Sequence, residues 1–114
     1  MTMKLKPDDI GVTEGTGNVF ADLGMADAVD RQTKTRLAVE INEILKLRGL
    51  RQAVTGTMLG VPQSNVSALV NYRLDGFSVE RLMGFLTKLD RDVEIVIRPR
   101  RDAGSGSVSV HALR

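Results

Sequence analysis

The chain has no cysteine or tryptophan, and it has one histidine, one tyrosine and three phenylalanines among its 114 residues. Without cysteine it has no disulfide and no thiolate metal site, which suits a reducing compartment. The single His111 cannot build a His/Cys zinc cluster, and no catalytic context supports a Ser–His–Asp arrangement. So few aromatic rings also make a stacking platform for RNA bases hard to build. We therefore expect a protein that is not an enzyme and uses no metal or cofactor.

Long apolar runs are missing as well. No stretch approaches the ~18 apolar residues of a membrane span, and the N-terminus has no apolar signal core. The glycine-rich run at residues 104–106 lacks the lysine and following helix of a phosphate loop. What remains, 42% hydrophobic and 26% charged residues, is the composition of a soluble globular domain with tails. We expect a cytoplasmic protein.

The net charge of +2 conceals an asymmetry along the chain. Residues 1–30 carry two basic and six acidic side chains, a net −4, whereas residues 31–114 carry fourteen basic and eight acidic ones, a net +6. An acidic leader before a basic folded part fits a DNA-binding protein with a separate arm. A solvated surface of mixed charge is the plainer explanation, so charge alone does not decide for nucleic acid.

The rest of the chain is organised around residues 50–73, which we expect to form two short helices, 51–59 and 62–71, joined by a tight turn. Gly56 lies where the first helix must let the second approach closely, and Gly60 where the chain leaves the first helix at positive φ. Pro62 suits the opening of the second helix. Val66 and Leu69, spaced i, i+3, face back toward the first helix.

This spacing resembles the helix-turn-helix of the Cro/repressor-like (Xre) family of DNA-binding regulators. The resemblance implies a mainly helical, lambda-repressor-like bundle of four to five helices. Thr55 and Gly56 depart from the family, which usually has an apolar residue and alanine there. With Gly60 they weaken the first helix by ~1–2 kcal/mol relative to alanine. A plain helical hairpin is the alternative.

The flanking segments fit one helix-turn-helix domain over residues 18–92. Residues 1–17 lack periodicity and are expected to form a disordered arm. Residues 18–28 are interpreted as a clip over the core or as a contact for a partner protein. An apolar stripe predicts a helix over 30–48, and a second helix over 79–89 begins with Ser78 as its N-cap and a Phe77–Leu82 staple.

Residues 93–114 change period, because Val93, Ile95 and Ile97 alternate with other side chains and Ser107 to Ala112 alternates again. We expect a C-terminal β-strand or hairpin with a flexible loop. A lone hairpin is marginal in water, and its edge would be a pairing surface. The prediction is a homodimer through this strand, which suits a protein that binds two half-sites. A hairpin on its own core, or a frayed tail, are the alternatives.

The outward face of the second motif helix is short, polar and uncharged, as base contacts require. The family resemblance assigns base contacts to Gln63, Ser64 and Ala68 and a phosphate contact to Gln52. The plainer alternatives are that Gln63 and Ser64 only cap a helix, that Tyr72 packs, and that Arg73 pairs with Asp75. The full set of predicted DNA-binding residues is Arg51, Gln52, Gln63, Ser64, Asn65, Ser67, Ala68, Asn71, Tyr72 and Arg73.

Two functions follow. The first is a sequence-specific transcriptional regulator, with repression of its own operon as the default. The second comes from a closer resemblance over residues 17–98, carried by the Val-Phe-x-Asp-Leu-Gly pattern at 19–24 and by residues 77–82 and 92–95. This pattern is similar to Xre members that are HigA-like antitoxins. It implies a RelE/HigB-like toxin as partner, and the acidic leader suits such a basic toxin.

Overall fold

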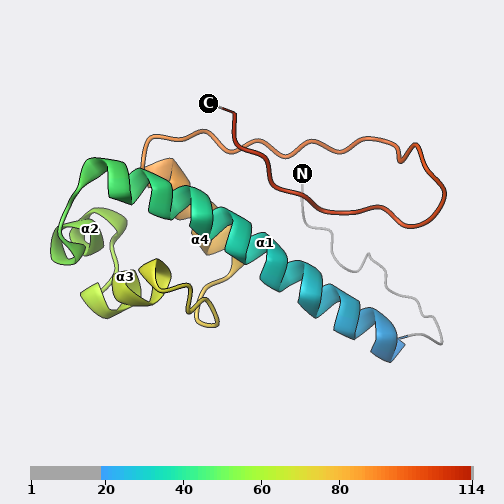
Figure 1. Cartoon of the computed structure of the whole chain (residues 1–114), viewed down its shortest axis with the longest axis horizontal. Helices are drawn as coiled ribbons and strands as arrows, with labels where there is room; N and C mark the ends of the chain where they lie inside the picture. The colour runs from blue at the N-terminus through green and yellow to red at the C-terminus, as the bar shows by residue number, and fades with distance from the viewer. Residues whose placement is uncertain (1–18, 114) are drawn as a thin grey trace.

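The computed structural model describes the backbone of residues 19–113 and the side chains of residues 27–113. The predicted arm over 1–17 lies outside the described residues. Four helices make up the described part: α1 (Val19–Arg48), α2 (Gln52–Leu59), α3 (Gln63–Val70) and α4 (Val79–Lys88). In Figure 1, α1 crosses the molecule, α2 and α3 lie below its C-terminal half, and α4 lies behind it. The predicted mainly helical bundle is confirmed.

Helix α1 begins at Val19 and is 30 residues long, whereas the sequence analysis placed its start near residue 30. Residues 19–28, expected to form a segment separate from this helix, instead form the first turns of α1. They contain no proline, and three alanines with one leucine and one methionine favour helix over this stretch. A helix of this length extends about 45 Å, and its N-terminal half projects beyond the other helices (Figure 1).

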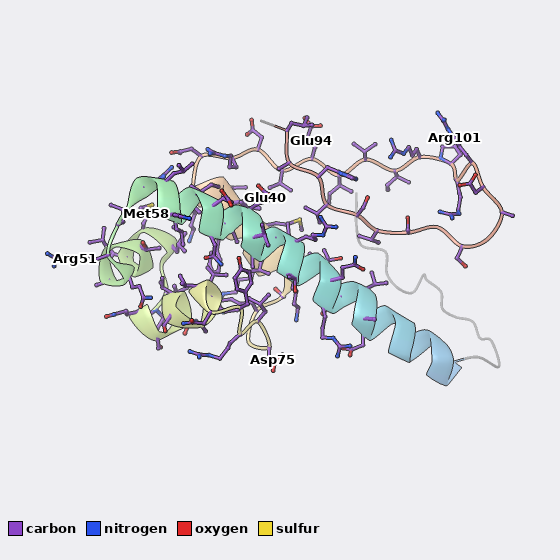
Figure 2. The ribbon with its side chains drawn as sticks, viewed as in Figure 1. Glu40, Arg51, Met58, Asp75, Glu94 and Arg101 are labelled. Atoms are coloured by element: carbon purple, nitrogen blue, oxygen red, sulfur yellow. The ribbon has the colours of Figure 1, made fainter. Side chains whose placement is uncertain are left out.

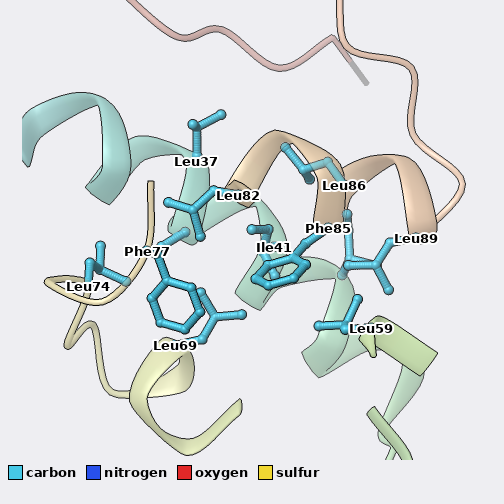
Figure 3. Close-up of a cluster of buried hydrophobic side chains, with 12 residues drawn as sticks. Leu37, Ile41, Leu59, Leu69, Leu74, Phe77, Leu82, Phe85, Leu86 and Leu89 are labelled. Atoms are coloured by element: carbon cyan, nitrogen blue, oxygen red, sulfur yellow. The ribbon is translucent and has the colours of Figure 1, made fainter. Parts of the chain in front are cut away.

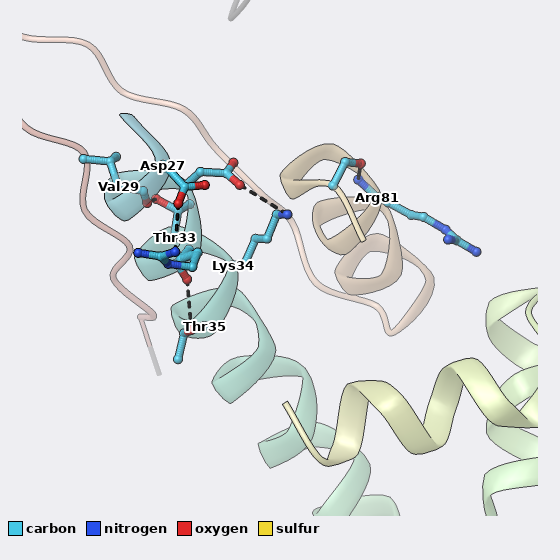
Figure 4. A network of polar contacts seen from close by, with 9 residues as sticks. Asp27, Val29, Thr33, Lys34, Thr35 and Arg81 are labelled. Atoms are coloured by element: carbon cyan, nitrogen blue, oxygen red, sulfur yellow. Dashed lines mark hydrogen bonds and ion pairs between the residues drawn. The ribbon is translucent and has the colours of Figure 1, made fainter. Parts of the chain in front are cut away.

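Local polar contacts support the projecting half of α1 (Figure 4). Arg31 pairs with Asp27 at 2.8 Å and Lys34 pairs with Asp30 at 3.2 Å, both at i, i+4 spacing. The Thr33 hydroxyl also donates to the Val29 carbonyl at 2.8 Å. Such pairs stabilise an exposed helix by a few tenths of a kcal/mol each, roughly. These contacts within residues 27–34 are all local to the helix.

The core begins further along α1 and is shared with α4 (Figure 3). Leu37 and Ile41 of α1 pack with Leu82 and Leu89. Ile41, Leu82 and Leu89 are completely buried. Phe77 is buried too, as the predicted staple with Leu82 requires. Burying each such side chain contributes about 1.5–3 kcal/mol. The core thus fixes α1 against α4 and gives α2 and α3 a support.

Arg48 ties the C-terminal end of α1 to that of α4. Its Nη2 donates to the Leu89 carbonyl oxygen at 3.1 Å and lies 3.1 Å from the Asp90 carboxylate. Asp90 has a positive φ of 66° and follows α4 directly. The link closes the end of the bundle nearest α2.

The predicted C-terminal strand is not found: residues 91–113 contain no strand and, from residue 92 on, make no backbone–backbone hydrogen bond within the described part. The segment leaves α4, runs out along the side of α1 away from α2 and α3, and returns (Figure 1). Ile95 and Ile97 are 55% and 84% exposed, and only Val110 packs against the core. The segment thus buries little of its apolar surface, which leaves too little to hold a two-stranded ladder.

Candidate nucleic-acid interface

The two motif helices are joined by a turn that depends on Gly60. Gly60 follows α2 with φ 76° and ψ 33°, the left-handed conformation expected for this position. Its N–H donates to the Gly56 carbonyl at 2.8 Å, and the Val61 N–H donates to the same oxygen at 2.9 Å. One carbonyl therefore accepts both amides that turn the chain, and α3 starts two residues later.

Gly56 is the closest approach between α2 and the turn. A Cβ built on it would lie 2.7 Å from the Val61 carbonyl oxygen and 3.5 Å from a methyl of Val66. The first distance is too short for carbon and oxygen without movement of the backbone. The sequence analysis assigned Gly56 to close packing, and the structure makes the requirement stricter: even a methyl group does not fit.

The inward face of α3 is as predicted, whereas Ser67 and Ala68, expected on the outward face, are only partly exposed. Val66 and Leu69 are each 1% exposed, whereas Gln63 and Ser64 at the start of the helix are exposed. Asn65, Ser67 and Ala68 are half-buried, and Ala68 packs partly against the core. Helix α3 contains no charged residue, and the first charged residue after it is Arg73.

Helices α2 and α3 both begin without a cap. Arg51 and Pro62 occupy the N-cap positions in extended conformation, and neither makes a side-chain hydrogen bond to the helix. Neither side chain contains an acceptor, and no acidic residue stands in either first turn. The first amides of both helices thus have no side-chain acceptor at the N-cap, the arrangement found at phosphate-binding helix N-termini. Figure 2 shows Arg51 pointing outward from the start of α2.

The exit from α3 holds three further predicted residues. The Arg73 N–H donates to the Ala68 carbonyl and the Tyr72 N–H to the Leu69 carbonyl, at 2.8 and 3.1 Å. This is a Schellman ending, and it places Tyr72 at φ 58°, a position that favours glycine. The side-chain amide of Asn71 donates to the Ser67 carbonyl of the same helix at 2.8 Å. Within the described residues Arg73 makes no ion pair with Asp75, so the pairing alternative is not found.

Two residues that the sequence analysis did not assign to the site hold the far ends of the motif helices. The Asn42 amide of α1 donates to the Leu69 carbonyl of α3 at 3.2 Å. The Lys88 ammonium of α4 donates to the Leu59 carbonyl of α2 at 3.0 Å. Both helices are therefore anchored at their C-terminal carbonyls and open at their N-terminal amides. In the sequence, a polar asparagine next to the core residue Ile41 could have indicated the Asn42–Leu69 hydrogen bond. Nothing in the sequence indicated the Lys88–Leu59 hydrogen bond.

Other kinds of site find no support in the described part of the chain. His111 is exposed, with its Nε2 3.1 Å from the Ser109 hydroxyl. No cluster of three or more metal-ligating side chains occurs among the described residues. No helix there has the length and hydrophobicity needed to cross a bilayer. The uncapped pair α2–α3 is thus the candidate site that stands out.

The comparisons with known proteins agree with this class of site. A family model described as a helix-turn-helix domain matches residues 19–98. A solved structure named as an XRE family transcriptional regulator is 51% identical, with a TM-score of 0.73, over 76% of this chain and 99% of that chain. No curated protein matches the chain.

The fold and the site therefore define a helix-turn-helix protein. The chain belongs to the XRE family of helix-turn-helix regulators, which confirms the family predicted from residues 50–73. The prediction that it is not an enzyme is also confirmed, since this is a family of DNA-binding regulators. The HigA-like subgroup stays a prediction.

Proposed function

We propose that this chain is a sequence-specific transcriptional regulator that acts in the cytoplasm and represses its own operon. The observation that carries the proposal is the pair of uncapped helix N-termini at α2 and α3 beside an exposed, uncharged polar surface. Open amides favour phosphate, and short polar side chains suit base edges. The solved relative carries the name of a transcriptional regulator.

In this proposal α3 enters the major groove with its N-terminal turn first. Gln63 is exposed there and can bond N6 and N7 of adenine, and Ser64 beside it can bond a base or a phosphate. Asn65, Ser67 and Ala68 are half-buried, so less of each side chain is available to contact DNA. Ala68 is suited to contact a thymine methyl. Direct base readout therefore falls mainly on the first turn of α3.

Backbone contacts would come from both ends of the motif. Arg51 and Gln52 stand at the open start of α2, and Asn71, Tyr72 and Arg73 follow α3. Arg51 and Arg73 supply charge, whereas Gln52 and Tyr72 supply hydrogen bonds. Such contacts hold the protein in register on DNA but carry no sequence information.

The test is binding to the DNA directly upstream of its own gene, measured by fluorescence anisotropy at several salt concentrations. A shuffled duplex of equal length is the control. We expect a preference of at least ~10³-fold for the upstream DNA, with a log–log salt slope that counts the phosphate contacts. Equal, weak binding to both duplexes would contradict the proposal.

We also propose that the regulator is a homodimer that pairs through the C-terminal segment, residues 92–113. This segment combines backbone groups that make no ladder with exposed β-branched side chains, above all Val96 and Ile97 at 72% and 84% exposure. Pairing with the same segment of a second copy would supply the missing hydrogen bonds and bury these side chains. Its position away from α2 and α3 leaves those helices free for DNA (Figure 1).

The mass in solution at micromolar concentration tests the dimer. Sedimentation equilibrium should give twice the 12.4 kDa of one chain. Ile97→Lys should reduce this to the monomer mass, whereas Leu47→Lys should not, although Leu47 is as exposed, at 82%. A monomer mass for the unaltered protein would contradict the proposal.

A second candidate function is favoured by the charge of the leader. Residues 1–30 have a net charge of −4 from two basic and six acidic side chains, which suits binding of a basic protein. The chain would then be an antitoxin that blocks a RelE/HigB-like toxin and represses its operon as a second role. Co-expression with a small basic protein encoded beside it should give a complex that survives gel filtration. Separate elution of the two proteins would exclude the antitoxin role for that pair.

A further inference from the structure

We infer that Asn42 is a positioning residue for α3, acting through one hydrogen bond to set how the helix sits against α1. This inference rests on the proposed function, since α3 is its DNA-reading helix. The Asn42 Nδ2 donates to the Leu69 carbonyl at 3.2 Å, and the two residues are 27 positions apart. It is thus a link between separate elements.

The chemistry at position 42 is unfavourable for stability alone. Asn42 lies half-buried beside Ile41, which is completely buried. Its side-chain oxygen is buried and finds no hydrogen-bond partner within the described part of the molecule. A buried acceptor without a partner is costly, and an apolar side chain of similar size would avoid that cost. The benefit of asparagine here must come from its N–H donor.

That donor acts on a part of α3 where position matters. Leu69 is itself 1% exposed, and it lies in the last turn, at the end opposite the open amides. The hydrophobic effect favours burial of α3 against α1 but is not directional. A hydrogen bond to a carbonyl has a preferred distance and angle, so it adds a directional restraint on the position of α3. Asn42 therefore limits where Gln63 and Ser64, at the other end of α3, can point.

The test separates positioning from stability with two variants and a control. Asn42→Leu removes the donor and keeps an apolar side chain of similar size, and Asn42→Asp keeps the shape but cannot donate. Thr33→Val is the control, because it removes a side-chain bond to the Val29 carbonyl within α1 alone, away from α3. We expect both Asn42 variants to lose about tenfold in preference for the upstream DNA over a shuffled duplex, with the salt slope unchanged.

Thermal unfolding gives the second readout. Asn42→Leu should unfold at the same temperature as the unaltered protein or a higher one. Its reduced DNA preference would then not be caused by unfolding. A purely structural role predicts the reverse, a lower unfolding temperature and an unchanged DNA preference in the folded fraction. That result would overturn the inference.

A distance measurement tests the inference even if DNA binding fails. The chain has no native cysteine, so Arg36→Cys on α1 and Val70→Cys on α3, both exposed positions, can carry spin labels. Pulsed electron paramagnetic resonance should give a broader or shifted α1–α3 distance distribution in Asn42→Leu and Asn42→Asp, and no change in Thr33→Val. An unchanged distribution in both Asn42 variants overturns the inference. Absence of DNA preference in the unaltered protein, by contrast, refutes only the proposed function.

Discussion

Helices α3 and α4 follow one another along the chain and have similar lengths, yet they begin in opposite ways. Helix α4 starts with Ser78, whose hydroxyl accepts the Arg81 N–H at 3.0 Å, and has Glu80 in its first turn. Helix α3 starts with Pro62, without a cap and without an acidic residue. A helix with a cap and an acid needs no anion from outside. The difference separates a scaffold helix from one that is open to phosphate.

The α2–α3 motif and α4 also differ in their glycines and in the residues that follow α3 and α4. Gly56 of the α2–α3 pair has no space for a Cβ, whereas a Cβ on Gly84 of α4 would meet nothing within 4 Å. After α3 the left-handed position holds Tyr72, and after α4 it holds Asp90, a residue type that tolerates this conformation. The motif thus keeps residues that cost stability, which is typical of functional sites.

The largest effect is expected for the first turns. Gln63→Ala should lower the affinity for the upstream DNA by about 1–3 kcal/mol and relax the preference at one base pair, because the bidentate contact is lost. Glu80→Ala, in the first turn of α4, should leave base preference unchanged. Competition binding against single-base variants of the duplex measures both. Equal losses on upstream and shuffled DNA for Gln63→Ala would remove it from base readout.

Next comes the pair of glycines. Gly56→Ala should lower the free energy of unfolding by roughly 1–2 kcal/mol, since the overlap with the Val61 carbonyl outweighs the gain in helix propensity. Gly84→Ala should raise it by about 0.5–1 kcal/mol, because the added methyl gains propensity without a clash. Urea unfolding measures both. If both substitutions stabilise the protein, α2 and α3 are not in the close contact described.

The two N-caps should then respond in opposite directions. Ser78→Ala should lower stability by about 1 kcal/mol and leave DNA binding unchanged. Arg51→Asp should raise stability by roughly 0.5–1 kcal/mol by capping α2, yet weaken binding to all DNA about tenfold. Arg36→Asp, the same charge change on exposed α1, is the control for net charge. Anisotropy and urea unfolding measure the two properties, and unchanged DNA binding by Arg51→Asp would exclude α2 from the interface.

The smallest effect is expected at the left-handed positions. Tyr72→Gly should stabilise the protein by about 0.5–1 kcal/mol, because glycine adopts positive φ without strain. It should also weaken binding to the upstream and the shuffled duplex equally, since the proposed contact of the phenol is to the DNA backbone. Asp90→Gly loses the ion pair with Arg48 and should leave DNA binding unchanged. A Tyr72→Gly variant with full affinity would make Tyr72 a packing residue.

The sequence predicted the motif well because its signals are local. A positive φ at Gly60, a close approach at Gly56 and burial of Val66 and Leu69 each follow from residue type and spacing. The Ser78 cap was predictable for the same reason, since it depends on four consecutive residues. Family resemblance then fixed the arrangement of the helices.

What the sequence could not show depends on contacts between distant segments. The Asn42–Leu69 and Lys88–Leu59 bonds each join residues nearly thirty positions apart, and no spacing rule predicts them. The start of α1 was missed because residues 19–28 have an irregular apolar pattern and mix good helix formers with glycine and aspartate. The C-terminal alternation predicted a strand, but a strand needs a partner, and the described chain alone provides none.

The central claim, that α2 and α3 offer their open N-termini to DNA while α4 does not, is tested most directly by amide chemical shifts. The ¹⁵N-labelled protein would be titrated with the upstream duplex at low salt. We predict the largest shifts at the amides of Gln52, Ala53, Gln63 and Ser64, and none at those of Val79 and Glu80. Shifts at the start of α4 with none at the starts of α2 and α3 would contradict the account.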